Sequence, residues 1–310
     1  MHAAVVTEFD TPPHYLEHPD PEATRPGELV VEVVAAALHP RVRSQADGSH
    51  YTSTGALPLV PGIDAVVRDA SGRLRYALLD DTDLGTMAER TVIEEDRSVP
   101  LPAHVDPVAV AAGMNPVMSS WVALRRRIEL PRHARVAVLG ATGNAGRMAI
   151  QVAKRFGASE VIAVGRTPER LAPLTALGAD RVCSFAEVSA AADVDVVLDY
   201  VWGKATADAM LAMIPARADR SAPLTWVQIG SVGGLEAPLP SAAFRAARLQ
   251  LVGSGIGSVP GHDFAKELPA IAKAVSAGDF DIRARAVPLA DVENAWESSR
   301  DSDERIVFVP

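Results

Sequence analysis

Short apolar segments alternate with amphipathic ones through the middle of the chain, between about residues 135 and 257. The apolar segments are rich in Val, Ile and Leu, which is typical of buried strands. The predicted strands are 135–139, 160–164, 181–184, 194–199, 224–229 and 249–253. Between the first two, apolar residues recur at helical spacing from about Asn144, and Gly157 marks the end of that helix. Strands that alternate with helices need crossover connections, so we expect an α/β fold with a six-stranded, parallel, doubly wound sheet.

The segments on either side of this region have a different pattern. Prolines separate short β-like runs in the first third, and two more such runs lie near the C-terminus. These runs are 29–34, 65–68, 88–93, 283–288 and 305–309. Helices are predicted within the Ala-rich stretch 107–130 and at about 264–277. The parallel sheet is therefore expected to be flanked by β-rich segments at both ends.

Composition and charge exclude several classes of function. The 310 residues include 30 basic and 39 acidic side chains, a net charge of −9, which argues against nucleic acid or an anionic membrane as a partner. The single cysteine, Cys183, forms neither an internal disulfide nor a four-thiolate zinc site. We expect no signal peptide, because the first residues lack a basic region followed by an apolar core, and no apolar run of about 20 residues that would span a bilayer. These features predict a cytoplasmic protein in a reducing compartment.

The turn after the first predicted strand, 138-VLGATGNAG-146, is rich in small residues and leads directly into a helix. Small residues let the backbone approach a pyrophosphate, and the helix N-terminus supplies N–H donors and a positive dipole end. The turn therefore predicts a dinucleotide site, although a tight structural turn would show a similar pattern. The candidate binding residues in the turn are Ala141, Thr142, Gly143, Asn144, Ala145 and Gly146.

The end of the second strand indicates which nicotinamide cofactor binds. An acid at this place would accept a hydrogen bond from the ribose 2′-hydroxyl, whereas the sequence reads 161-VIAVGRTPERL-171. Its one acid, Glu169, is expected to interact with a helix dipole. Arginine suits a phosphate, so NADPH (NADP+) is favoured over NADH. The alternative is that the arginines are solvated surface residues. The candidate residues here are Gly165, Arg166, Thr167 and Arg170.

Several segments, taken together and in order, resemble the medium-chain dehydrogenase/reductase superfamily, in particular its zinc-free quinone oxidoreductase branch. They are 59-LVPGIDAVV-67, 85-GTMAERTVI-93, 112-AGMNPVMSSWVAL-124, 138-VLGATGNAG-146, 177-LGAD-180, 196-VVLDYVWG-203 and 227-VQIGSVGG-234. The resemblance implies a GroES-like, β-rich catalytic domain formed by residues 1–116 and 258–310, and a Rossmann NADP-binding domain at 117–257. It also implies an active site in the cleft and a homodimer through the sixth strand, 249–253.

The resemblance places the zinc ligands of metal-dependent members at positions that have changed in this chain. The His-Glu pair that follows Pro-Gly in those members is Ile63-Asp64 here, and the cysteine positions correspond to His39 or Pro40 and to the neighbourhood of Asn115. We therefore expect no metal. Reduction of an activated C=C bond or a quinone fits this absence, because hydrogen bonds are enough to polarise the acceptor.

Four residues are candidates for catalysis. The resemblance places Tyr51 in a loop that faces the nicotinamide, where a phenol is able to donate a proton or simply form a wall of the pocket. Neighbouring His50 titrates near neutral pH and would serve in the same way, unless it is a surface histidine. His39 replaces an Asn that is usual in the branch, and is either a hydrogen-bond donor or an interior histidine. Asn115 would contact the nicotinamide ribose or the substrate carbonyl.

Two further turns are expected at the carboxyl edge of the sheet, where doubly wound folds bind the nicotinamide. Phe185 stands where related reductases often have a Tyr at the 2′-phosphate, which weakens the case for NADPH slightly. The candidate contacts in the two turns are Gly230, Ser231, Val232, Gly253, Ser254 and Gly255.

The leading hypothesis is an NADPH-dependent, zinc-independent oxidoreductase that transfers hydride to a quinone, enone or other activated C=C or C=O substrate. A zinc-free alcohol or carbonyl oxidoreductase is the second hypothesis. The third is a catalytically silent NADPH-binding sensor or structural protein, since His39 replaces the usual Asn and Val66 the usual Gly.

Overall fold

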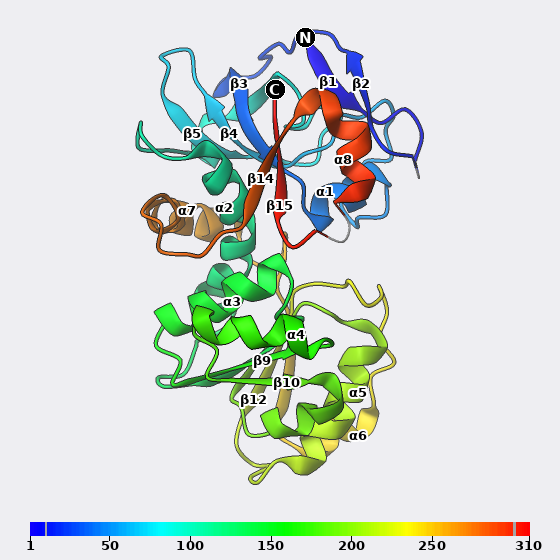
Figure 1. Ribbon diagram of the computed structural model, residues 1–310, viewed down its shortest axis with the longest axis vertical. Coiled ribbons are helices and arrows are strands. Elements are labelled where there is room, and N and C mark those ends of the chain that lie inside the picture. The colour runs from blue at the N-terminus through cyan, green and yellow to red at the C-terminus, as the bar shows by residue number, and fades with distance from the viewer. Residues whose placement is uncertain (10, 300–301) are drawn as a thin grey trace. The chain divides into compact units, whose positions relative to one another are not determined.

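Six parallel strands between residues 135 and 253 pair into one sheet, in the order β10-β9-β8-β11-β12-β13 (Figure 1). Their bounds are β8 Arg135–Leu139, β9 Glu160–Gly165, β10 Arg181–Ser184, β11 Val196–Asp199, β12 Leu224–Gln228 and β13 Leu249–Gly253. The order changes direction between β8 and β11, which is the place where doubly wound sheets open a crevice for ligands. The six predicted strands are confirmed, and their ends differ from the prediction by at most two residues.

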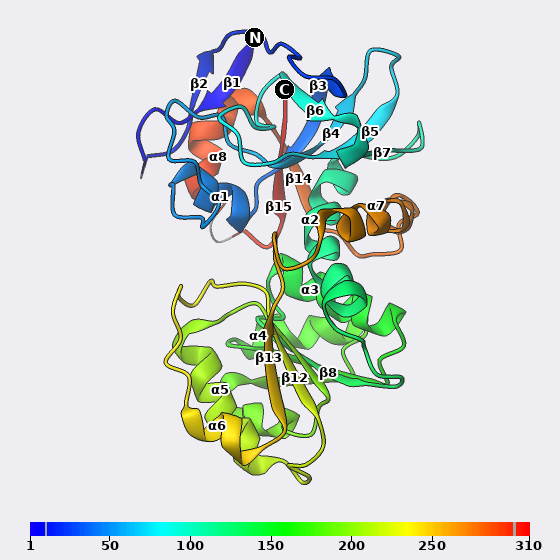
Figure 2. The ribbon, with the colours of Figure 1, turned by 180° about the vertical axis from the view of Figure 1, so that it is seen from behind.

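The computed structural model describes residues 1–9, 11–299 and 302–310, and these divide into two compact units. The first unit is Met1–Asn115 with Leu268–Pro310, and the second is Pro116–Glu267. Both chain ends belong to the first unit (Figure 2). The predicted fold class, a doubly wound sheet with a separate β-rich part, is confirmed.

Helices cover both faces of the parallel sheet in the second unit. Helix α5 places Met210 on one face, together with Val188 and Ala243 from neighbouring helices, over the buried Trp226 of β12. Helix α3 buries Ala149 and Val152, and its predicted start at Asn144 is confirmed. Because both faces are covered, the inner strands β8, β9 and β11 are almost continuously apolar instead of alternating. The helical segments of this unit are α3 Asn144–Arg155, α4 Pro168–Leu171, η3 Ala172–Leu177, η4 Phe185–Ala191, α5 Gly203–Ala216 and α6 Ser241–Ala246.

The first unit is built on a second sheet, with the order β14-β15-β3-β4-β5-β7 and with β6 also paired to β3. Its pairs are antiparallel except β14 with β15. A separate antiparallel pair is formed by β1 and β2. The strands are β1 His2–Val5, β2 His14–Glu17, β3 Glu28–Ala37, β4 Asp64–Arg68, β5 Leu74–Leu78, β6 Arg90–Glu94, β7 Ser98–Pro100, β14 Ala284–Pro288 and β15 Arg305–Val309.

Helices α1 and α8 pack against the core of the first unit. The two boundaries between the units lie within the longer helices α2 and α7. Trp296 of α8 and Phe308 of β15 belong to the same buried cluster as Val42 of α1. Within the described residues, one helical run, Pro107–Arg127, is long and apolar enough to cross a membrane by composition, but 72% of its apolar window is buried inside the fold, as in the core helix of a soluble protein. The helical segments of this unit are α1 Pro40–Ala46, η1 Glu95–Arg97, η5 Leu289–Asp291 and α8 Val292–Ser298. Helices α2 Pro107–Val122 and α7 Gly261–Ser276 belong partly to each unit, and η2 Ala123–Arg127 lies in the second.

Candidate functional site

The turn between β8 and α3 presents backbone N–H groups at the carboxyl edge of the parallel sheet. Gly140 adopts φ +80°, and its N–H and that of Ala141 both donate to the carbonyl of Val164 at 3.0 Å, so the turn is fixed to β9. Gly143 is the N-cap of α3, and no side chain caps the helix. The first N–H groups of α3, on Asn144, Ala145 and Gly146, are therefore available to an anion.

The two glycines of the turn have different roles. A Cβ at Gly146 would lie 2.4 Å from the carbonyl oxygen of Gly140 and 2.6 Å from the Cα of Ala141, so this glycine is needed for the helix to pack against the turn. A Cβ at Gly143 would meet only the Gly140 oxygen, at 3.5 Å, which is ordinary contact. The backbone is thus open at Gly143, where a phosphate would approach.

At the carboxyl end of β9 the structure exposes cationic side chains, and residues 161–168 include no acid. Arg166 is exposed and makes no hydrogen bond or ion pair with any other residue that the structure describes. Thr167, also exposed, is the N-cap of α4, and Arg170 follows in its last turn. Glu169 lies in the first turn of α4, where a carboxylate interacts favourably with the helix dipole, as expected.

The absence of a side chain at Gly165 lets the end of β9 lie close to the phosphate turn. A Cβ at Gly165 would be 3.1 Å from the Cγ2 of Thr142 and 3.0 Å from a methyl group of Leu171. Phe185 packs against the core of this unit, so it offers no polar group to a phosphate. The residues predicted to hold the two phosphate groups thus lie on adjacent strand ends.

The turns after β11 and β12 are joined to each other on the far side of the crevice. Asp199 accepts the N–H of Ile229 with its backbone carbonyl at 2.8 Å, and that of Gly230 at 3.1 Å. The N–H of Gly233 donates to the carbonyl of Val201 at 2.7 Å. Gly230 has no room for a side chain, because its Cβ would lie 2.6 Å from the Tyr200 carbonyl oxygen.

The predicted nicotinamide contacts extend from these turns to the end of β13. Ser231 and Val232 are exposed, the latter at 74%. Ser254 is fixed by its N–H, which donates to the carbonyl of Gln228 at 2.8 Å. The Gly253 carbonyl accepts from the Arg127 side chain at 2.6 Å, whereas the Gly255 N–H donates to the hydroxyl of Ser258.

In the first unit, Tyr51 and His50 lie on a loop held by a polar cluster. Tyr51 is 71% exposed, and its ring lies 4.2 Å from that of His50, measured between centroids. The Thr52 hydroxyl is hydrogen-bonded to the His50 Nδ1 at 2.8 Å, to Asp81 and to Arg41 at 2.8 Å, and Arg41 forms an ion pair with Asp81. The cluster thus anchors the loop on which the two candidate residues stand.

Partial burial and the positive charge of Arg41 determine the protonation state of His50. Burial has the larger effect, and the two together lower the pKa of His50 to about 4. The imidazole is consequently neutral at pH 7 and offers at most one N–H, so the expectation that His50 titrates near neutral pH is wrong. Sequence reasoning missed Arg41, Thr52 and Asp81, because no motif joins residues so far apart in the chain.

His39 lies in the interior of the first unit. Its side chain is 2% exposed, and Nε2 is 2.8 Å from an Asp64 carboxyl oxygen that serves as its acceptor. The hydroxyl of Tyr76 donates to the other oxygen of Asp64 at 2.7 Å. Burial lowers the pKa of His39, so the ring is neutral. Asp64 is thus a core carboxyl group, and His39 is an interior histidine hydrogen-bonded to it.

Asn115 is half-buried in α2, directly before Pro116, which lies inside that helix. Its side-chain amide makes no hydrogen bond with a residue that the structure describes. Across the described part of the chain, three or more His, Cys, Asp or Glu side chains do not gather in a group that would hold a metal.

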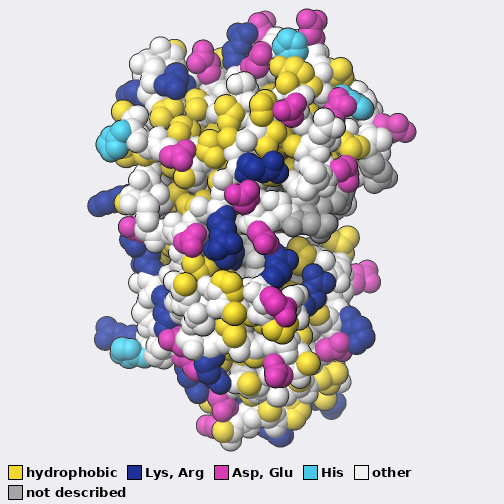
Figure 3. Space-filling view, viewed as in Figure 1, with side chains coloured by type: hydrophobic (Ala, Val, Ile, Leu, Met, Phe, Trp, Pro, Cys, Tyr) yellow, Lys and Arg dark blue, Asp and Glu magenta, His cyan; other side chains and the backbone are white. Residues whose placement is uncertain are grey.

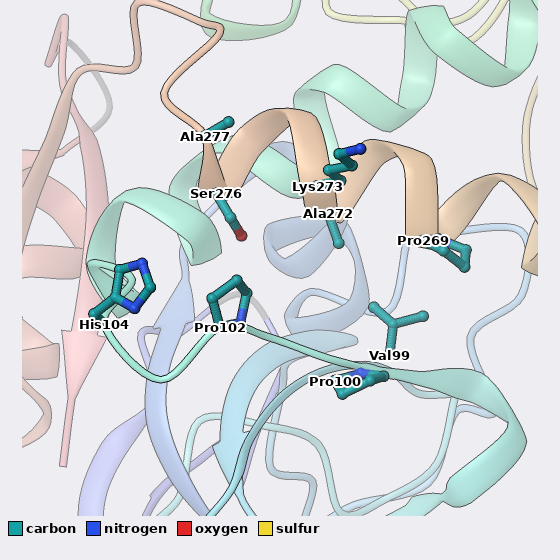
Figure 4. A pocket seen from close by; sticks show the side chains of 9 residues that line it. All are labelled: Val99, Pro100, Pro102, His104, Pro269, Ala272, Lys273, Ser276 and Ala277. Carbon is teal, nitrogen blue, oxygen red and sulfur yellow. The ribbon is translucent and has the colours of Figure 1, made fainter.

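A pocket of the first unit lies between the segment after β7 and helix α7 (Figure 4). Its wall is mostly apolar, and the Ser276 hydroxyl points toward Pro102 without a hydrogen-bond partner among the described residues. The lining residues are Val99, Pro100, Pro102, His104, Pro269, Ala272, Lys273, Ser276 and Ala277. They include none of the predicted site residues, so this pocket does not bear on the cofactor site.

Comparison with known proteins gives consistent matches. A model of the zinc-binding dehydrogenase family matches residues 145–273. The probable NADPH-dependent quinone reductase tdiC of Emericella nidulans is 29% identical, with 100% of both chains covered. The chloroplastic NADPH-dependent alkenal/one oxidoreductase of Arabidopsis thaliana is 32% identical over 49% of this chain and 44% of that protein. The quinone oxidoreductase of Thermus thermophilus, also solved as a complex with NADPH, superposes with a TM-score of 0.85 at 26% identity, covering 100% of each chain.

Proposed function

Because this chain belongs to the medium-chain dehydrogenase/reductase superfamily, in its quinone oxidoreductase-like branch, we propose that it reduces a quinone, an enone or another activated C=C or C=O substrate with NADPH. The observation that carries the proposal is the N-terminus of α3, which no side chain caps and where the backbone of Gly143 is open. It follows β8, and the exposed Arg166 follows the neighbouring strand β9. When bound, NADPH supplies the hydride for the reduction.

The residues of the second unit fit this cofactor in three places. The N–H groups that follow Gly143 would bind the pyrophosphate. Arg166, Thr167 and Arg170 would bind the 2′-phosphate, and the absence of an acid at the end of β9 avoids repulsion. The turns at Gly230–Val232 and Gly253–Gly255 would border the nicotinamide. We assign cofactor binding to residues 117–257 and the catalytic domain to residues 1–116 and 258–310.

We propose that Tyr51 polarises the acceptor and supplies a proton to it, in place of a metal. A phenol is protonated at neutral pH and donates a hydrogen bond to a developing oxyanion. His50 is neutral and its ring lies against that of Tyr51, so its proposed role is to orient the Tyr51 ring. His39 supports the domain through Asp64, and Asn115 is proposed to contact the substrate or the ribose. No metal enters this scheme.

The proposed partners are small molecules. The protein is a soluble enzyme, and we propose a cytoplasmic location, which suits its one free, buried cysteine. Acidic and basic side chains are interspersed on the face shown in Figure 3, consistent with no nucleic-acid or membrane partner. Strand β13 is one of the two outer strands of the parallel sheet and carries apolar side chains, so we propose a homodimer formed through it.

The function is tested by the consumption of NADPH, with NADH in parallel, against a quinone, an enone, an enal, an enoyl thioester and a ketone. We expect turnover of the quinone or the conjugated acceptors, and a higher kcat/KM with NADPH than with NADH. Turnover of simple alcohols with NADP+ and no reduction of conjugated acceptors would favour an alcohol oxidoreductase. Tight NADPH binding without turnover of any acceptor would favour a sensor.

Substitution Tyr51→Phe should lower kcat about tenfold with the best acceptor and leave the dissociation constant of NADPH unchanged. A general acid typically contributes about 10²–10⁴-fold, but Tyr51 is 71% exposed, so water partly replaces its proton. The control is Tyr15→Phe, in β2 and outside the proposed site. Equal rates for Tyr51→Phe and the wild type would remove Tyr51 from the mechanism.

A further inference from the structure

Trp202 has a backbone conformation that is normally reserved for glycine. It follows β11 as the N-cap of α5, with φ +59° and ψ −165°. Residues with a Cβ are rarely found in this region, and the conformation persists only where the surrounding structure enforces it. Such backbone strain is most often found at functional sites.

The carboxylate of Asp199 holds this backbone conformation through hydrogen bonds. Its side chain is fully buried, and one carboxyl oxygen accepts the N–H groups of Val201 at 2.8 Å and Trp202 at 3.0 Å. The other oxygen accepts the hydroxyl of Thr206 at 2.6 Å and the indole N–H of Trp226 at 2.9 Å. Each oxygen of the carboxyl group thus accepts two hydrogen bonds, and together they fix the turn.

A second contact holds the turn from the side. A Cβ at Gly203 would lie 2.4 Å from the carbonyl oxygen of Gly233, so the two turns touch through their backbones. The hydrogen bond from Gly233 to the Val201 carbonyl closes the same junction at 2.7 Å. The position of Trp202 is therefore set by contacts of the main chain of residues 201–203, and not by its own side chain.

The indole of Trp202 contributes nothing visible to that arrangement. Its N–H has no hydrogen-bond partner, and its ring makes no stacking or cation–π contact, among the residues that the structure describes. The side chain is half-buried, so part of its surface is presented to solvent. A strained backbone that positions an otherwise uncommitted aromatic ring suggests a ligand for that ring.

The location of Trp202 indicates which ligand this is. It stands at the carboxyl end of β11, which pairs with β8 on one side and β12 on the other. The pyrophosphate turn follows β8 and the 2′-phosphate residues follow β9, so the opposite half of the crevice, over β11 and β12, is left for the nicotinamide and the acceptor next to it.

We propose that Trp202 is a specificity-determining residue that stacks on a planar, aromatic acceptor, so that fused-ring quinones and aryl-conjugated enones are preferred over small ones. This inference rests on the proposed function for the nature of the acceptor. Stacking is more favourable when the aromatic ring is already held in place. The enforced backbone fixes the position of Trp202 before the acceptor binds.

The strain is tested with the protein free of cofactor. Trp202→Gly and Trp202→Ala both remove the indole, but only glycine is at ease at φ +59°. Glycine normally destabilises relative to alanine, whereas here we expect Trp202→Gly to melt about 2–4 °C above Trp202→Ala. A higher melting temperature for Trp202→Ala would overturn the enforced conformation and with it the proposal.

The specificity is tested by comparing kcat/KM for naphthoquinone and benzoquinone. We expect the wild type and Trp202→Phe to prefer naphthoquinone, and Trp202→Gly to lose about tenfold of that preference, with NADPH affinity unchanged. An unchanged preference would refute the proposal, and so would a loss of NADPH affinity of the same size, which would assign the ring to the nicotinamide.

A binding measurement separates this inference from the proposed function. If the wild type binds NADPH but reduces no acceptor, the proposed function fails. The affinity of naphthol for the protein loaded with NADP+ then still reports on Trp202, because it involves no turnover. We expect Trp202→Gly to bind naphthol about tenfold more weakly than Trp202→Phe. Equal affinities would overturn the stacking role.

Discussion

Substitution Gly143→Asp should weaken NADPH binding at least about a hundredfold in a protein that still folds. The N-cap position of α3 has φ −77°, which an aspartate adopts easily, and a Cβ there makes only ordinary contact. Aspartate is a preferred N-cap residue, so its carboxylate would accept the N–H groups that the pyrophosphate needs. It would also place a negative charge where the phosphates bind.

Thermal unfolding and NADPH fluorescence titration measure this effect together. We expect the melting temperature of Gly143→Asp to equal or exceed that of the wild type, because the new cap stabilises α3. Gly143→Ala is the matched control, with a similar Cβ and no charge, and should bind NADPH within a few-fold of the wild type. Gly146→Ala is expected to destabilise the protein, since its Cβ meets backbone at 2.4 Å. Wild-type affinity in Gly143→Asp would place the pyrophosphate elsewhere.

Substitution Arg166→Glu should reverse the cofactor preference. The carboxylate would repel the 2′-phosphate and accept a hydrogen bond from a ribose 2′-hydroxyl, as acids at this strand end do in NADH-binding proteins. We expect the dissociation constant of NADPH to rise about a hundredfold and that of NADH to stay the same or fall.

Arg166→Gln separates the loss of the cation from the gain of an anion. It should weaken NADPH binding about tenfold without changing NADH binding, and the difference should shrink as the ionic strength rises, because Arg166 is exposed. Arg181→Gln is the control for a nearby surface arginine, since Arg181 is paired with Glu160. Equal losses for both cofactors in Arg166→Glu would show that the 2′-phosphate is not bound there.

The parallel sheet was predictable because its inner strands β8, β9 and β11 are buried on both faces and appear in the sequence as nearly unbroken apolar runs. The same argument fails in the first unit. Helix α1, Pro40–Ala46, buries only Val42 and Ala46 among its apolar residues, so no helical period is visible. Strands β1 and β2 have four residues each, too few for an alternation to stand out. Tertiary pairing determines these elements more than local sequence does.

The candidate site divides in the same way. The phosphate turn could be predicted because Gly143 and Gly146 are close in sequence and act through the local backbone. The cluster of Arg41, Thr52 and Asp81 could not, because Asp81 lies 40 residues from Arg41 in the chain and only the tertiary fold brings the two together. The strained backbone at Trp202 is likewise invisible in the sequence, because the identity of a residue does not determine its φ angle.

The place of β15 in the first unit affects how the chain folds as it is synthesised. This strand, Arg305–Val309, lies between β14 and β3, and Phe308 is fully buried in the core that the N-terminal strands share. The β3 edge therefore stays without this neighbour until residue 309 has left the ribosome, whereas the second unit is complete some forty residues earlier. We expect nascent chains to expose an apolar strand edge throughout that interval, which is when a chaperone would protect them.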